Sequence, residues 1–178
     1  PPRRALMRGP SRTLRELTAV TPSPGSWVAA TQAMLAVVLP AVVFTAAGAA
    51  SLGLLASFGA LVVMYLSGRS RRERAAKLPV IAAGFVLGSL LGILTGDSLT
   101  ASLLAIGAVA IAFSFLSLAF DVGPPGAIFP VLTTGSMGQL TAPASSGGAA
   151  MDPGVVLATI VVGILAGYAA VVAPLLVP

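Results

Sequence analysis

A glycine-rich apolar segment constrains the fold of this chain more than any other feature. Within it, four glycines are spaced by four residues, namely Gly84, Gly88, Gly92 and Gly96. Residues with this spacing share one face of a helix. Each glycine weakens a helix by about 1 kcal/mol relative to alanine, so four in register need a compensating contact. In a membrane that contact is the close approach of a second helix, and the segment therefore predicts a tightly packed transmembrane helix.

The composition indicates a membrane location for the whole chain. Of its 178 residues, 57% are hydrophobic and 8% are charged, whereas a soluble domain carries about 25% charged residues. The chain has too few polar side chains to coat a soluble protein. Its length fits one membrane domain built from helices of about 20 residues each. We therefore expect an all-α integral membrane protein.

The residue types argue against an enzyme. The sequence contains no histidine and no cysteine, which removes the commonest zinc and haem ligands together with thiolate chemistry. It shows no pair of catalytic carboxylates and no phosphate-binding loop, because its glycine-rich stretches lie inside apolar segments. We expect no enzymatic activity, no metal and no cofactor.

Apolar segments and turn residues predict six transmembrane helices after a short N-terminal region. The predicted spans are 27–47, 52–67, 79–96, 99–120, 127–141 and 153–174. Residues 1–26 form a separate basic segment, either an interfacial elbow with a short helix over residues 12–20 or a solvated tail. Residues 27–178 form one membrane domain.

Basic residues predict how these spans are oriented. Every Lys and Arg lies between Arg3 and Lys77, in the N-terminal segment and in a predicted loop at 68–78. Two spans separate these regions, so both lie on one side, and their charge places that side in the cytoplasm. Six spans then put both chain ends and Asp121 inside. A basic segment on a chain this apolar indicates contact with anionic lipid headgroups rather than with nucleic acid.

The fifth predicted span is short and polar compared with the others. It follows a turn that a regular helix cannot include, formed by Gly123, Pro124, Pro125 and Gly126. A helix that restarts there would direct free N–H groups and its positive dipole end towards an anion, and Thr133, Thr134 and Gln139 would line the anion's path. An ordinary loop, followed by a helix whose hydroxyl groups bond backbone carbonyls, explains these residues equally well.

A basic cluster before the glycine-rich helix is a second candidate site. Its members are Arg69, Arg71, Arg72, Arg74 and Lys77. They either ring a cytoplasmic vestibule that concentrates organic anions, or they set the topology and hold anionic headgroups. Arg74 and Lys77 lie nearest the membrane and are the better candidates for the anion path. The glycine face serves helix packing or leaves room for a substrate, and Gly163 and Gly167 predict a second packing face in the last span.

The order of these features resembles a known family. The small-residue second span, the Arg-rich region before the helix at 80–96, and the turn at 123–126 are similar to the membrane domain of the fusaric acid resistance and aromatic acid exporter (FUSC-like) proteins. The resemblance covers roughly residues 27–176. It implies a multi-pass protein of the bacterial inner membrane, associated with efflux of aromatic or other organic acids. Family members often have two six-span halves and cytoplasmic domains, whereas this chain has one predicted six-span unit.

Two hypotheses of function follow. The resemblance and the basic cluster imply an exporter or channel component for organic, including aromatic, anions, which works as a homodimer through small-residue faces or with a partner membrane subunit. The alternative is a non-transporting scaffold or accessory subunit that packs against another membrane complex. A transporter would place the basic cluster, Thr133, Thr134 and Gln139 along one polar path, whereas a scaffold would bury these residues in helix contacts.

Overall fold

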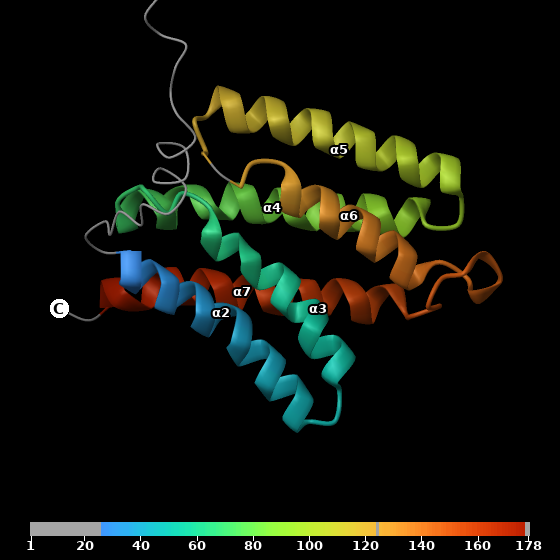
Figure 1. The fold of residues 1–178 in the computed structure, drawn as a ribbon, viewed down its shortest axis with the longest axis horizontal. Coiled ribbons are helices and arrows are strands. Elements are labelled where there is room, and N and C mark those ends of the chain that lie inside the picture. The colour runs from blue at the N-terminus through green and yellow to red at the C-terminus, as the bar shows by residue number, and fades with distance from the viewer. Residues whose placement is uncertain (1–25, 124, 177–178) are drawn as a thin grey trace, which may run out of the picture.

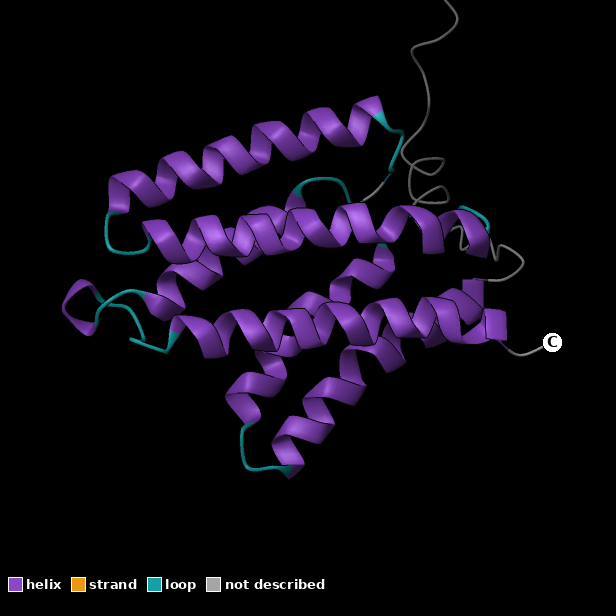
Figure 2. Ribbon diagram, turned by 180° about the vertical axis from the view of Figure 1, so that it is seen from behind, coloured by secondary structure: helices purple, strands orange, loops and turns teal. Residues whose placement is uncertain are grey.

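The computed structural model describes residues 26–123 and 125–176, and all regular structure in these ranges is helical (Figures 1 and 2). The helices are α2 (Ser26–Ala46), α3 (Ala50–Ala60), the 3₁₀ turn η1 (Leu61–Met64), α4 (Arg71–Thr95), α5 (Leu99–Ala119), α6 (Ile128–Thr141), the 3₁₀ turn η2 (Ala144–Ser146) and α7 (Pro153–Leu176). The prediction of an all-α fold is confirmed for these ranges. The interfacial helix predicted over residues 12–20 lies outside the described residues.

Three helices in the described ranges are long and apolar enough to cross a membrane, judged by length and composition: Arg71–Thr95, Leu99–Ala119 and Pro153–Ala173. Two further apolar helices are shorter, at Ala30–Ala46 and Ala50–Met64, and α6 has 14 residues. An α-helix needs about 20 apolar residues to span the hydrocarbon core. The number of spans therefore stays a prediction beyond the three long helices.

Helices α4, α6 and α7 lie at the centre of the arrangement, between α5 on one side and α2 and α3 on the other (Figure 1). Helix α3 packs on α7 and α2, whereas the main contacts of α5 are with α4 and α6. The start of α2, the start of α4 and the end of α7 lie at the same end of the molecule (Figure 1). The basic cluster and the end of the last helix thus lie at one end of the molecule, whereas the orientation in the membrane stays a prediction.

Helix α4 begins earlier than the sequence predicts, and this corrects the predicted loop at 68–78. Ser70 caps the helix by accepting a hydrogen bond from the Glu73 N–H at 3.4 Å, as N-cap serines do. Pro79 lies inside α4 and cannot bond the carbonyl of Ala75 one turn earlier. The hydroxyl of Tyr168 on α7 donates to that carbonyl at 3.2 Å. The freed carbonyl is thus satisfied, and the helix continues through the proline.

A continuous apolar core joins η1, α4, α6 and α7. Phe85, Met137 and Ile160 are fully buried in it, and the Tyr65 ring meets Phe85 edge to face, with 5.8 Å between ring centroids. No described residue of α5 belongs to this core. Helix α5 lies at one edge of the molecule and buries only Ala105 and Val109. Its outward side chains are mainly large and apolar, as expected for a lipid-facing helix.

The glycines predicted to pack helices lie where backbones of this same chain meet. A Cβ atom added at Gly163 of α7 would overlap the carbonyl group of Ala56 on α3. A Cβ at Gly92 would overlap the carbonyl oxygen of Thr134 on α6, and one at Gly96 would lie 2.5 Å from the carbonyl oxygen of Gly138. Gly167 faces Ala60 in the same way, at 2.8 Å. These faces are occupied by internal contacts, so a dimer would have to use other surfaces.

Candidate functional site

A groove of about 740 Å³ runs between α4 and α5. Gly84 and Gly88 line its α4 wall, and Phe113 lies opposite on α5. A Cβ atom added at Gly84 would collide with the Phe113 ring, while one at Gly88 would approach Thr134 Oγ1 at 2.9 Å. The glycine face therefore makes two kinds of contact. Gly92 and Gly96 pack against α6, and Gly84 lines the groove opposite Phe113. Gly88 lines the groove and also lies close to Thr134 of α6.

Polar side chains line this groove at one end only. They are Tyr65, Lys77 and Ser117, and the other lining residues are apolar or glycine. Lys77 is the first groove residue on α4. Ser117 lies near the end of α5, which an ion pair between Asp121 and Arg69 holds beside the start of α4. The groove thus has a cationic end and an apolar body.

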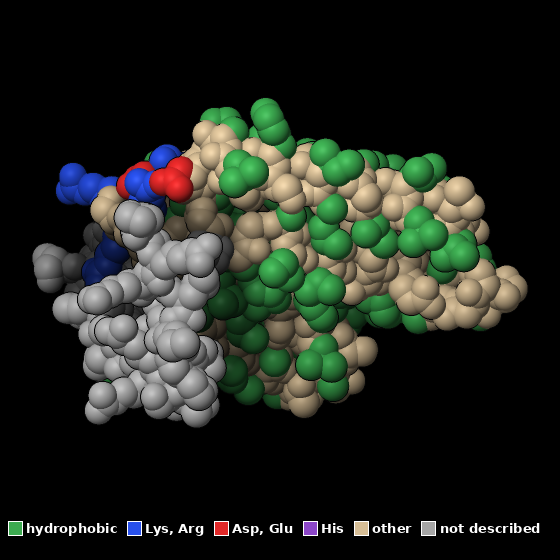
Figure 3. All heavy atoms as spheres, turned by 45° about the horizontal axis from the view of Figure 1, so that its top comes forward, with side chains coloured by type: hydrophobic (Ala, Val, Ile, Leu, Met, Phe, Trp, Pro, Cys, Tyr) green, Lys and Arg blue, Asp and Glu red, His purple; other side chains and the backbone are tan. Residues whose placement is uncertain are grey.

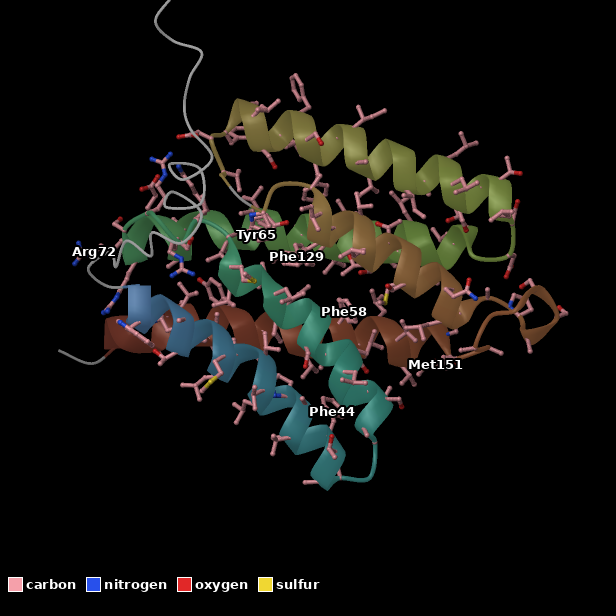
Figure 4. All side chains as sticks on the ribbon, viewed as in Figure 1. Phe44, Phe58, Tyr65, Arg72, Phe129 and Met151 are labelled. Atoms are coloured by element: carbon pink, nitrogen blue, oxygen red, sulfur yellow. The ribbon has the colours of Figure 1, made fainter. Side chains whose placement is uncertain are left out.

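The charges at this end form a connected network on the surface (Figure 3). Glu73 accepts a hydrogen bond from Lys77 Nζ at 2.8 Å and lies 3.8 Å from the Arg69 guanidinium. Arg69 pairs in turn with Asp121 and donates to its carbonyl oxygen at 3.3 Å. Arg71 and Arg72 are exposed, and Arg72 points away from the helices (Figure 4). Five cations here face two carboxylates, so the end is net positive.

Arg74 does not line the groove, although the sequence grouped it with Lys77. Its side chain is 5% exposed and donates to the carbonyl oxygen of Val63 in η1. Its Nε has no hydrogen-bond partner in the described part of the chain. The sequence predicts no buried charge, because it places the basic cluster in a loop at 68–78 before the third span. The fold of η1 back onto α4 is what buries this one.

The glycine–proline turn is held by Tyr65, which follows η1 and lies near the end of the second predicted span. The Tyr65 hydroxyl donates to the Gly126 carbonyl at 2.6 Å, and its ring meets Phe129 with 6.3 Å between centroids (Figure 4). Gly123 and Gly126 have φ values of +74° and +64°, which glycine adopts without strain. Pro125 lies between them, and Pro124 falls outside the described residues. A tyrosine at the end of an apolar segment indicates a hydroxyl that needs a hydrogen-bond partner. The sequence does not identify that partner, because Gly126 lies 61 positions away.

The polar residues of α6 satisfy the backbone rather than lining the groove. Thr133 and Thr134 are buried, and their hydroxyls donate to the carbonyl oxygen of Pro130 at 2.9 and 2.8 Å. Gln139 donates to the carbonyl oxygen of Gly147 at 2.7 Å and so fixes the loop after α6. The structure therefore brings Lys77 and Gly84 together in one site and leaves these three residues in helix and loop contacts.

Replacing Tyr65 by phenylalanine tests the contact that holds the turn. The change keeps both ring contacts and removes one hydroxyl, which leaves the partly buried Gly126 carbonyl without its donor. We expect a loss of about 1–2 kcal/mol in the free energy of unfolding. Thermal unfolding of the purified protein in detergent measures this loss. An unchanged transition temperature would show that the turn does not depend on Tyr65.

The groove can bind an organic anion whose remaining part is apolar. Lys77 supplies a positive charge for the anionic group, and the rest of the lining is mainly apolar. No group of three or more His, Cys, Asp or Glu side chains able to hold a metal occurs among the described residues. The arrangement offers binding and selection by charge.

These features define a membrane protein whose regular structure is all helical in residues 26–123 and 125–176. It is similar to the uncharacterized membrane protein YvaC of Bacillus subtilis (strain 168), with 32% identity over 110 residues. The match covers 62% of this chain and 17% of that protein, so the chain spans about a sixth of the relative's length. No family model matches the chain, and no solved structure matches it.

Proposed function

We propose that this chain is a membrane component of an exporter or channel for organic anions in the bacterial inner membrane, and that the groove between α4 and α5 binds the anion. One observation carries the proposal: the groove has a single cationic end at Lys77 and an apolar body that begins at Val80. The resemblance to aromatic acid exporters and the similarity to a bacterial membrane protein support it.

The charge distribution gives a route for the anion. A net positive end attracts anions from the aqueous phase and raises their local concentration. The carboxylate then exchanges with Glu73 at Lys77, whose side chain is 51% exposed. Its apolar part lies along the α4 wall formed by Val80, Leu87 and Leu91. The chain spans about a sixth of its relative's length, and we propose transport for an assembly that contains this chain.

Replacing Lys77 by glutamine tests this function. We expect the affinity for an aromatic carboxylate such as naphthoate to fall about tenfold, which corresponds to about 1.4 kcal/mol. The matched control is Arg72→Gln, which removes the same charge from the same helix but outside the groove. Binding is measured on purified protein and flux in proteoliposomes. Equal losses in both variants would indicate a general field effect, and no saturable binding in the unmodified protein would contradict the proposal.

A scaffold role is the second candidate, and the burial of Thr133 and Thr134 in helix contacts favours it. The partner would be a second copy or another membrane subunit that packs on the exposed side of α5. Native mass spectrometry of the complex extracted from its own membrane separates the two functions: a stable complex with no naphthoate binding supports the scaffold.

A further inference from the structure

We propose that the groove takes a membrane-dissolved amphiphile with one carboxylate head and a single long hydrocarbon tail, which enters sideways from the bilayer. This inference rests on the proposed function, because it specifies the ligand class for the same groove. A small aromatic acid would use only the charged end of the groove. A long-chain carboxylate would use the groove's whole length, its change from polar to apolar lining, and its open side.

The polarity gradient matches a head and a tail. Tyr65, Lys77 and Ser117 lie at the basic end, and the hydroxyl of Tyr65 is already used by Gly126. Lys77 therefore offers the charge, and Ser117 offers a hydroxyl that has no hydrogen-bond partner among the residues the structure describes. From Val80 to Leu91 the α4 wall is entirely apolar or glycine. A ligand that fills the groove must be ionic at one end and hydrocarbon along the rest.

The groove is as long as a lipid tail. Its α4 wall runs from Lys77 to Leu91, which at 1.5 Å per residue is roughly 21 Å. One leaflet contributes about half of the 30 Å hydrocarbon core, or about 15 Å. A full acyl chain therefore fits lengthwise, whereas a small aromatic acid occupies only the basic end.

The side of the groove is open to the surroundings. Val80, Leu87 and Leu116 on its two walls are 75%, 61% and 42% exposed. In a bilayer these side chains face hydrocarbon, so a tail slides from lipid into the groove without crossing water. The Phe113 ring presses on Gly84 and narrows the middle of the groove, which favours one chain over the two chains of a phospholipid.

The carboxylate head group of the ligand determines which amphiphiles the groove binds. Lipid tails are as apolar as the groove wall, so moving a tail from lipid into the groove gains little. The carboxylate must compete with Glu73 for Lys77. Removing that competitor by Glu73→Gln is therefore expected to raise affinity, and Lys77→Gln is expected to lower it about tenfold.

A photoreactive palmitate with a diazirine near the end of its tail tests the site. The full chain is placed in phosphatidylcholine nanodiscs, illuminated and mapped by mass spectrometry. We expect labels on both groove walls at the end away from Lys77, around Leu91 and Ala108. Ala112→Phe fills the groove and should reduce labelling about tenfold, while Ala119→Phe, on the same helix outside the groove, should leave it unchanged. Gel filtration checks that both variants fold, and Lys77→Gln gives an independent test because it leaves the groove's shape intact.

Competition decides which ligand class is right. Palmitate should displace the probe better than dodecanoate, and dodecanoate better than octanoate. Equal displacement by naphthoate would overturn the tail requirement and leave organic-anion binding standing. Equal displacement by phosphatidylglycerol would overturn the single-chain ligand in favour of a phospholipid. Uniform labelling along the exposed side of α5, unaffected by Ala112→Phe, would show that the groove is not a site.

Discussion

Phe85→Ala is expected to lower the free energy of unfolding by about 3–5 kcal/mol. The ring is completely buried between α4 and the neighbouring helices, and it meets Tyr65 edge to face. Truncation removes these contacts and leaves a cavity that rigid helices fill poorly. Chemical or thermal unfolding in detergent micelles measures the change.

The matched control is Phe115→Ala on α5. That ring is 70% exposed, so its loss should change stability by less than about 0.5 kcal/mol. If both variants lost the same stability, the core would not lie where the structure places it.

Gly163→Ala is the second change with a large expected effect, although it adds a single methyl group. The new Cβ would overlap the carbonyl oxygen of Ala56 and lie 2.7 Å from the carbonyl carbon and 3.0 Å from Cα. These are backbone atoms, so α3 itself would have to move away from α7. We expect a loss of about 3 kcal/mol, seen as a lower unfolding temperature.

Gly107→Ala provides the opposite case. A Cβ at Gly107 meets nothing within 4 Å, and alanine favours a helix by about 1 kcal/mol over glycine. This variant should be slightly more stable than the unmodified protein. A stable Gly163→Ala variant alongside it would contradict the close approach of α3 and α7.

The positions of the helices could be predicted because they depend on local sequence. The apolar segments end at turn residues, and each of the six predicted segments overlaps one of the helices α2 to α7 in the described ranges. Three of these helices are long and apolar enough to cross a membrane. The start of α4 could not be predicted. Pro79 resembles a helix boundary, and the donor that satisfies the carbonyl it frees is Tyr168, which lies on another helix.

The site was predictable only in part, because its contacts also depend on helices that are distant in the sequence. The sequence identified Lys77 and offered two roles for the glycine face, packing or space for a substrate. Which glycine has which role depends on the helix opposite it: α6 meets Gly92, and Phe113 of α5 stands over Gly84. Arg74 shares its local sequence with exposed arginines, and only the course of η1 buries it.

The peripheral position of α5 has a consequence for local stability. This helix contributes nothing to the continuous core among the described residues, and a surface ion pair between Arg69 and Asp121 holds its C-terminal end. Exposed ion pairs contribute about 0–1 kcal/mol. Segments with few buried contacts open at a small fraction of the global unfolding free energy. Helix α5 can therefore swing away from α4, and so widen the groove, while the rest of the molecule stays folded.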